Sequence, residues 1–169
     1  LIITATPFIR ERFQLINPNV IDINNFPVLD FDKVLPDWNI RENKVCYIGS
    51  LTKVRGITEL VKSLSYLDGV SLELGGNFSP EEYRNEVIGT KGWDKVKEYG
   101  FVDRETANMI MARSFAGLVV LHPIINYIDS LPVKMFEYMG AGIPVIASDF
   151  PLWKNIIEGN DCGICVDPM

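Results

Sequence analysis

The stretch D-S-L-P-V-K-M-F-E-Y-M-G-A-G-I-P-V-I-A-S, residues 129–148, is typical of a loop, a helix and a buried strand in succession. Pro132 suits the first turn of a helix, because its missing N–H is not needed there. Asp129 or Ser130 can cap the helix start. Two glycines spaced by one residue predict the end of the helix, and the apolar run that follows predicts a strand.

Lys134 and Glu137 place a cation and an anion inside this predicted helix. A helix start favours anions, because its free N–H groups and its dipole face outward. A carboxylate one turn further on can accept hydrogen bonds from the paired hydroxyls of a sugar. The combination predicts a nucleotide-sugar site. Alternatively, the two side chains are three residues apart and could pair with each other on one helix face.

The composition is that of a globular protein with a well-filled core: 169 residues, of which 47% are apolar and 22% charged. The net charge of −6 and the absence of a basic run argue against binding of nucleic acid or of an anionic membrane by this piece alone. The chain starts at Leu1 without a basic leader, so no cleavable signal peptide is expected, and its apolar runs are too short to span a bilayer.

The three cysteines, Cys46, Cys162 and Cys165, lie in apolar surroundings. Their odd number predicts reduced, buried thiols in a cytosolic protein rather than a disulfide framework or a zinc site. We therefore expect a cytoplasmic protein, with peripheral contact at the inner face of the cell membrane confined to the intact protein.

Strands alternate with helices from residue 44 onward, which predicts parallel βαβ units. We expect strands at 44–48, 70–74, 95–99, 117–121, 144–147 and 163–166, and helices at 57–67, 79–87, 103–113, 132–140 and 152–158. The predicted fold class is α/β, a Rossmann-like doubly wound parallel sheet with helices on both faces.

Residues 1–25 carry a separate strand–helix–strand pattern. A lone unit of this kind cannot bury both faces of its sheet, so we expect it to be the remnant of another domain. Residues 26–43 include Pro27 and Pro36 and predict a hinge, and residues 44–169 form the main domain. The sequence Asp30-Phe31-Asp32 in this hinge has the D-x-D form of metal–nucleotide sites, but ordinary turn residues are the expected reading there.

Unusual residues gather at the predicted carboxyl ends of the strands, where ligands bind in open α/β sheets. In strand order these are Gly49, Ser50 and Arg55; Gly75 and Gly76; Phe101 and Arg104; His122, Asp129 and Ser130; and Ser148 and Asp149. Arg55 would oppose the dipole of the helix it precedes, a penalty that a bound anion would reverse. A solvated surface arginine is the alternative. The glycine spacing fits neither a P-loop nor a dinucleotide fingerprint.

Together these residues resemble the nucleotide-sugar-binding, C-terminal half of family-4, or group 1, glycosyltransferases, which have the GT-B fold. The resemblance covers nearly the whole chain. It is carried by V-C-Y-I-G-S-L-T-K-V-R-G-I at 45–57, Y-G-F-V-D-R at 99–104 and S-L-P-x-K-x-F-E-Y-M-x-x-G-x-P-V-I-A-S at 130–148. It implies that residues 1–25 are the last βαβ unit of an N-terminal acceptor domain, and that 44–169 are a donor-binding domain truncated at its C-terminus.

The resemblance also implies roles for individual residues. Glu137 would hold the ribose hydroxyls, and Asp129, where the family usually has Glu, would reach toward the donor sugar; these two are the predicted catalytic residues. Ser50 stands where the family has a phosphate-binding Arg, and Arg55 where it has a Lys. The remaining donor-binding residues that it implies are Gly49, Gly76, Phe101, Val102, Ser130, Leu131, Val133 and Lys134.

The implied reaction is transfer of a sugar from a nucleoside-diphosphate sugar to a hydroxyl of a polysaccharide or glycolipid, with retention at the anomeric carbon. No metal or other cofactor is expected. The glycan or lipid-linked acceptor would bind mainly to the N-terminal domain, so this piece alone is expected to be inactive. Two alternatives stay open: a degenerate, non-catalytic nucleotide- or partner-binding module, favoured by Ser50 and Asp129, and a nucleotide-sugar epimerase of the same fold, for which His122 is the only candidate acid–base.

Overall fold

The computed structural model describes residues 1–28 and 37–169. The D-x-D sequence at Asp30 and Asp32 and much of the predicted hinge lie outside these residues.

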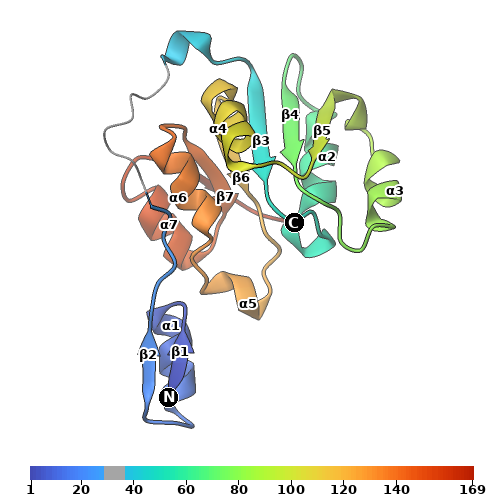
Figure 1. The fold of residues 1–169 in the computed structure, drawn as a ribbon. Coiled ribbons are helices and arrows are strands. Elements are labelled where there is room, and N and C mark those ends of the chain that lie inside the picture. Colours follow the sequence, from blue (N-terminus) through green and yellow to red (C-terminus); the bar gives the residue numbers. More distant parts are fainter. Residues whose placement is uncertain (29–36) are drawn as a thin grey trace.

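Six parallel strands form the central sheet, in the order β5-β4-β3-β6-β7-β8 (Figure 1). The strands are β3 (Lys44–Ile48), β4 (Ser71–Gly75), β5 (Val96–Gly100), β6 (Ala116–Val119), β7 (Val145–Ser148) and β8 (Gly163–Val166). Counted from β3, this order is 3-2-1-4-5-6, that of the Rossmann sheet. The predicted fold class is confirmed.

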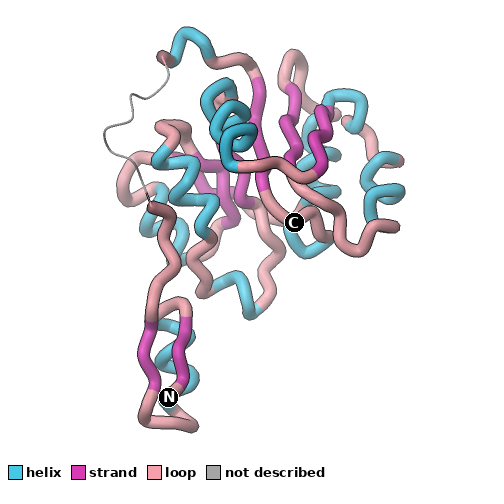
Figure 2. The backbone as a smooth tube through the Cα atoms, viewed as in Figure 1, coloured by secondary structure: helices cyan, strands magenta, loops and turns pink. Residues whose placement is uncertain are grey.

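Helices cover both faces of the sheet, as Figure 2 shows around the magenta strands. On one face lie α2 (Ile57–Leu64) and α3 (Tyr83–Ile88); on the other lie α4 (Arg104–Arg113), α6 (Val133–Gly140) and α7 (Pro151–Ile157). Side chains alternate along a strand, so adjacent residues of β3 point to opposite faces of the sheet. Tyr47 packs into the core under α2 and α3, and Cys46 into the core under α4, α6 and α7.

Helix α6 packs closely on the sheet because its large residue Tyr138 lies over a glycine of β6, Gly117. A Cβ atom added to Gly117 of β6 would lie 2.2 Å from the ring of Tyr138, so the ring lies directly on the strand backbone. The Tyr138 hydroxyl accepts a hydrogen bond of 3.0 Å from the backbone N–H of Ile48. Both contacts hold α6 against β3 and β6, and thereby fix the position of its N-terminal end.

One predicted helix start is wrong by several residues, and others are displaced by one. The helix predicted from Ser79 begins at Tyr83, because the N–H of Ser79 donates to the carbonyl of Leu51 at 2.9 Å and holds this segment beside the loop after β3. The helix predicted from Pro132 begins at Val133, with Pro132 as its N-cap and no side-chain cap.

Neither predicted cap, Asp129 nor Ser130, is available to that helix. The Ser130 hydroxyl donates to the carbonyl of Tyr127 at 2.9 Å, and Asp129 ends a short helix, α5 (Ile125–Ile128), that the sequence does not predict.

The N-terminal residues form a small unit of their own, apart from the main sheet in Figure 1. It comprises β1 (Ile2–Thr4), α1 (Pro7–Gln14) and β2 (Val20–Asp22), and the two strands pair in parallel. No residue of α1 is buried. The unit therefore leaves much apolar surface exposed, from Leu1, Ile3, Phe8, Phe13, Leu15, Ile16, Ile21 and Ile23.

Within residues 1–28 and 37–169, no helix is both long and apolar enough to cross a membrane. The three cysteines are unbonded. Cys46 is buried, and this burial raises the pKa of its thiol to about 12. Cys162 and Cys165 are only partly buried, so the prediction of buried thiols holds for Cys46 alone.

Candidate functional site

A hollow of about 470 Å³ lies at the carboxyl end of β3. It is lined by Ile48, Gly49, Arg55, Val102, Asp103, Arg104, Ala107, Pro132, Val133, Lys134 and Glu137. The chain leaves β3 toward one face of the sheet and leaves the neighbouring β6 toward the other, so the hollow lies beside the point where the strand order reverses. This is where open α/β sheets bind their ligands.

Two glycines allow the backbones to meet at the floor of this region. Gly49 has φ 141° and Gly76 has φ 139°, values that favour glycine. A Cβ atom on Gly76 would lie 1.8 Å from the carbonyl oxygen of Gly49. A Cβ atom on Gly49 would lie 2.9 Å from Nζ of Lys134, so the bare backbone admits the ammonium group.

The ammonium group of Lys134 is buried although the residue as a whole is partly exposed. It lies 3.6 Å from the ring centroid of Tyr47 and has no hydrogen-bond partner among the described residues. Burial lowers the pKa of Lys134 well below its usual range, and the nearby Arg55 lowers it further, while Glu137 opposes the shift. A cation so placed would be stabilised by an anion in the hollow.

Arg55 supplies a second cation at the same glycine. It ends a 3-10 turn, Lys53–Arg55, just before α2, and its Nη1 would lie 3.8 Å from a Cβ atom on Gly49. Burial lowers its pKa, but the hydroxyls of Tyr47 and Tyr127 more than offset this, and the net pKa is raised. Arg55 therefore stays charged beside Lys134, and the two positive groups form a site suited to a polyanion such as a diphosphate.

Glu137 lies one turn further along α6 and pairs with Arg104. The Arg104 Nη1 donates to Glu137 Oε1 at 2.5 Å. Arg104 comes from the first position of α4, which Asp103 caps by accepting the N–H of Thr106 at 2.8 Å. The alternative in which Glu137 pairs with Lys134 is thus not the arrangement in the structure. The carboxylate faces the hollow, where it can accept further hydrogen bonds.

Six of the predicted site residues line this hollow: Gly49, Arg55, Val102, Val133, Lys134 and Glu137. The others lie outside its lining: Ser50, Gly76, Phe101, Asp129, Ser130 and Leu131. Phe101 follows β5 with 79% of its surface exposed. The carbonyl of Ser50 accepts the Tyr47 hydroxyl at 3.1 Å, and that of Ser130 accepts Nε1 of Trp153 at 2.7 Å, so both loops are held against the core.

Asp129 faces the N-terminal unit. Its carboxylate pairs through Oδ2 with Nη2 of Arg12 in α1, and its carbonyl accepts the hydroxyl of Thr6 at 3.0 Å. His122 lies against α2, with Nε2 3.1 Å from Oε1 of Glu59, and does not line the hollow. The candidate acid–base of the epimerase alternative is therefore directed elsewhere.

Tyr47 is a part of the site that the sequence does not assign to it, and Arg104 is named only among the residues at the strand ends, without a role. Arg104 stands at a strand end in Y-G-F-V-D-R, but its pairing with Glu137 is not predicted. Tyr47 gives no such signal, since an aromatic residue in a buried strand is typical of core packing.

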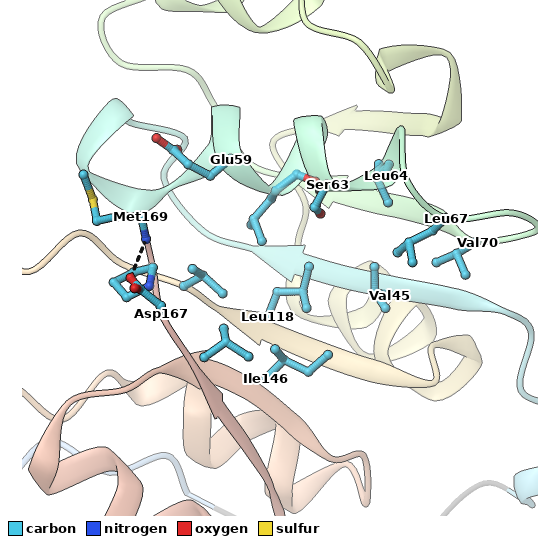
Figure 3. Close-up of a pocket in the computed structure, with 14 residues that line it drawn as sticks. Val45, Glu59, Ser63, Leu64, Leu67, Val70, Leu118, Ile146, Asp167 and Met169 are labelled. Atoms are coloured by element: carbon cyan, nitrogen blue, oxygen red, sulfur yellow. Dashed lines mark hydrogen bonds between the residues drawn. The ribbon is translucent and has the colours of Figure 1, made fainter.

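A second hollow, of about 320 Å³, lies between α2 and the strands β3, β6 and β7 (Figure 3). Its walls are apolar, and the labelled side chains of Leu64 and Leu67 lie across from those of Leu118 and Ile146. Glu59 and Asp167 are its charged residues, and none of the predicted site residues lines it. None of its described lining residues offers a cation to a phosphate, so the chemistry favours the hollow at Gly49.

The family model for glycosyl transferases group 1 matches residues 30–169. The chain belongs to this family. No individual curated protein matches it. The match confirms the family that the motifs predict.

Solved structures of glycosyltransferases share the fold. Sucrose-phosphate synthase from Thermosynechococcus elongatus superposes with a TM-score of 0.75 and 19% identity, over 99% of this chain and 45% of that one. HepE from Anabaena in complex with UDP-glucose superposes with a TM-score of 0.76 and 16% identity, over 99% of this chain and 50% of HepE. WaaG, a glycosyltransferase involved in lipopolysaccharide biosynthesis, superposes with a TM-score of 0.73 and 15% identity, over 98% of this chain and 48% of WaaG. The chain thus spans about half the length of these structures.

Proposed function

We propose that the chain is the donor-binding part of a retaining glycosyltransferase that takes its sugar from a nucleoside-diphosphate sugar. The observation that carries this proposal is the buried ammonium of Lys134, which has no hydrogen-bond partner within residues 1–28 and 37–169 and lies beside Arg55 at the bare backbone of Gly49. Two cations beside one glycine, of which the ammonium has no partner in the described part of the chain, leave a place for a diphosphate. HepE, which has the same fold, has been solved with UDP and with UDP-glucose.

In this proposal Arg55 and Lys134 hold the diphosphate and stabilise the charge that develops on it as the sugar leaves. Backbone N–H groups at the start of α6, near Val133, add to this stabilisation. The carboxylate of Glu137 accepts hydrogen bonds from the ribose hydroxyls, and its ion pair with Arg104 orients it. The base lies along Val102, which faces the same hollow.

The acceptor is a hydroxyl of a polysaccharide or glycolipid, held by a second lobe to which residues 1–25 belong. The apolar surface that β1, α1 and β2 leave exposed supports such a lobe. Transfer needs both lobes, so the chain by itself should bind the nucleotide and turn over no sugar. No observation at the hollow favours the epimerase, since His122 lies at Glu59.

Isothermal titration of residues 1–169 with UDP, GDP and ADP tests the proposal. One of the three should bind, and Glu137→Ala should weaken that binding by about 10- to 100-fold, because hydrogen bonds to a charged group are lost. Glu86→Ala is the matched control: Glu86 is a glutamate in a surface ion pair, 2.8 Å from Lys53 and outside the hollow. Absence of heat with all three nucleotides, or equal affinity of the two variants, would contradict the proposal.

A further inference from the structure

Asp129 is held from two sides by the N-terminal unit. Arg12 of α1 pairs with its carboxylate, and the hydroxyl of Thr6 donates to its carbonyl at 3.0 Å. Thr6 is itself fixed: it is 1% exposed and caps α1 by accepting the N–H of Ile9 at 3.3 Å. The start of α1 therefore docks on the residue that opens the loop before α6.

A third contact joins the same two parts. The segment after β2 places Phe26 against Phe136 of α6, with ring centroids 4.9 Å apart and an interplanar angle of 83°. Phe136 is the neighbour of Glu137 in the chain. The N-terminal unit thus touches the loop before α6, and the segment after β2 touches α6 itself, although the sheet of the unit is separate from the main one.

The two arginines of α1 differ in what they contact. Arg10 pairs with Asp22 of β2 at 2.5 Å and closes the unit on itself, whereas Arg12 reaches out of the unit to Asp129. Arg12 engages Oδ2 of Asp129, and Oδ1 is then the atom that would accept a hydroxyl. An arginine that binds one carboxylate oxygen restricts the rotation of the carboxylate.

We propose that Arg12 is a positioning residue that orients the Asp129 carboxylate toward the sugar of the donor, so that the N-terminal unit takes part in recognising the sugar but not the nucleotide. The inference rests on the proposed function. Asp129 lies outside the hollow proposed for the diphosphate, on the loop that leads into α6, and its carboxylate contacts the N-terminal unit. A sugar that extends from the diphosphate along this loop would meet the remaining carboxylate oxygen. Arg12 touches neither substrate; it acts through Asp129.

The test compares a nucleotide with its sugar ester on residues 1–169, using UDP with UDP-glucose and GDP with GDP-mannose in calorimetric titrations. Arg12→Ala should leave the affinity for the nucleotide within twofold and lower the affinity for the sugar nucleotide by about tenfold. Arg12→Lys should restore part of that loss. Arg10→Ala is the control and should change neither affinity. Arg12 is 45% exposed, so its truncation should leave the fold intact.

Asp129→Asn should reproduce the loss, and combining it with Arg12→Ala should add little, because the two residues act as one unit. A wild-type chain that binds neither nucleotide would overturn the proposed function and this inference with it. If the wild type binds and Arg12→Ala keeps or improves its affinity for the sugar nucleotide, the proposed function stands and the role of Arg12 is refuted.

Discussion

Lys134 shows how a single residue can be costly to the empty protein and useful to the complex. Its ammonium is buried on the ring of Tyr47 beside Arg55, with Glu137 as the nearby anion. Taking a cation out of water without a partner is unfavourable, and an adjacent like charge adds to the cost. The residue therefore stores a penalty that a bound anion removes, which is the arrangement expected of a binding site rather than of a core.

Lys134→Met should therefore raise the free energy of unfolding of the empty chain by about 1 kcal/mol at pH 7. The lowered pKa of Lys134 means that, between its folded value and the usual 10.5, the unfolded chain binds more protons than the folded one. The free energy of unfolding of the wild type then rises with pH in that window. The difference in this free energy between Lys134→Met and wild type should therefore narrow toward pH 10. Denaturant unfolding across this range measures it, with the exposed Lys91→Met as control; a variant less stable than wild type throughout would contradict the account.

At this scale the sequence identifies the charged residues of the hollow but not their partners. Lys134, Arg55 and Glu137 could be named from their places in the motifs. The pairing of Glu137 with Arg104 could not, because it joins residues 33 positions apart on different helices. The ion pair of Arg12 with Asp129 is likewise a contact between distant parts, and depends on packing that a linear pattern does not contain.

Among the elements, α4 and α6 are tied together at the ends away from the hollow. Arg41 follows the 3-10 turn Trp38–Ile40 and donates through Nη1 to the carbonyl of Ser114 at 2.9 Å, and through Nη2 to that of Ala141 at 3.3 Å. These carbonyls terminate the two helices and have no partner within them. Arg104 lies at the N-terminal end of α4, and Glu137 lies one turn after the start of α6. Arg41 therefore helps to hold the two helices that carry this ion pair.

Arg41→Met should lower the free energy of unfolding by about 2–3 kcal/mol, because hydrogen bonds from a charged donor to buried carbonyls are lost. The free energy of unfolding of Arg41→Lys should lie between those of wild type and Arg41→Met, because one ammonium group cannot reach both helix ends as the two Nη atoms of a guanidinium can. Urea denaturation gives the comparison. Arg113→Met, an exposed arginine in the last turn of α4, is the control and should stay within about 0.5 kcal/mol of wild type. Equal effects of the two methionine variants would exclude a tying role for Arg41.

The sequence predicts the elements better than their ends. Each expected strand and helix of the main domain is present, because apolar periodicity reports burial directly. The predicted helix starts and caps are wrong where a tertiary contact overrides the local sequence signal. Ser79 is held by Leu51, and Asp129 is held by Arg12 and Thr6. The short helix α5 is missed because four residues carry no period.

For the whole molecule, the alternation of strands and helices predicts the doubly wound class, whereas the strand order comes from the structure alone. That order places β3 beside β6 and so brings the loop after β3 to the start of α6, with β5 leading into α4 at the same edge. Segments near residues 49–55, 101–104 and 131–137 meet there although they lie far apart in the chain. The assignment of residues 1–25 to a second lobe stays a prediction.

The central claim is that this edge binds the diphosphate of a nucleotide. Amide NMR spectra of residues 1–169 titrated with UDP, GDP and ADP test it most directly, since each amide reports its own surroundings. The account predicts that the nucleotide that binds shifts amides within 49–55, 101–104 and 131–137 and leaves the apolar hollow of Figure 3 unchanged. Shifts confined to the lining of that apolar hollow, around Glu59 to Leu67 and Val166 to Met169, would contradict it.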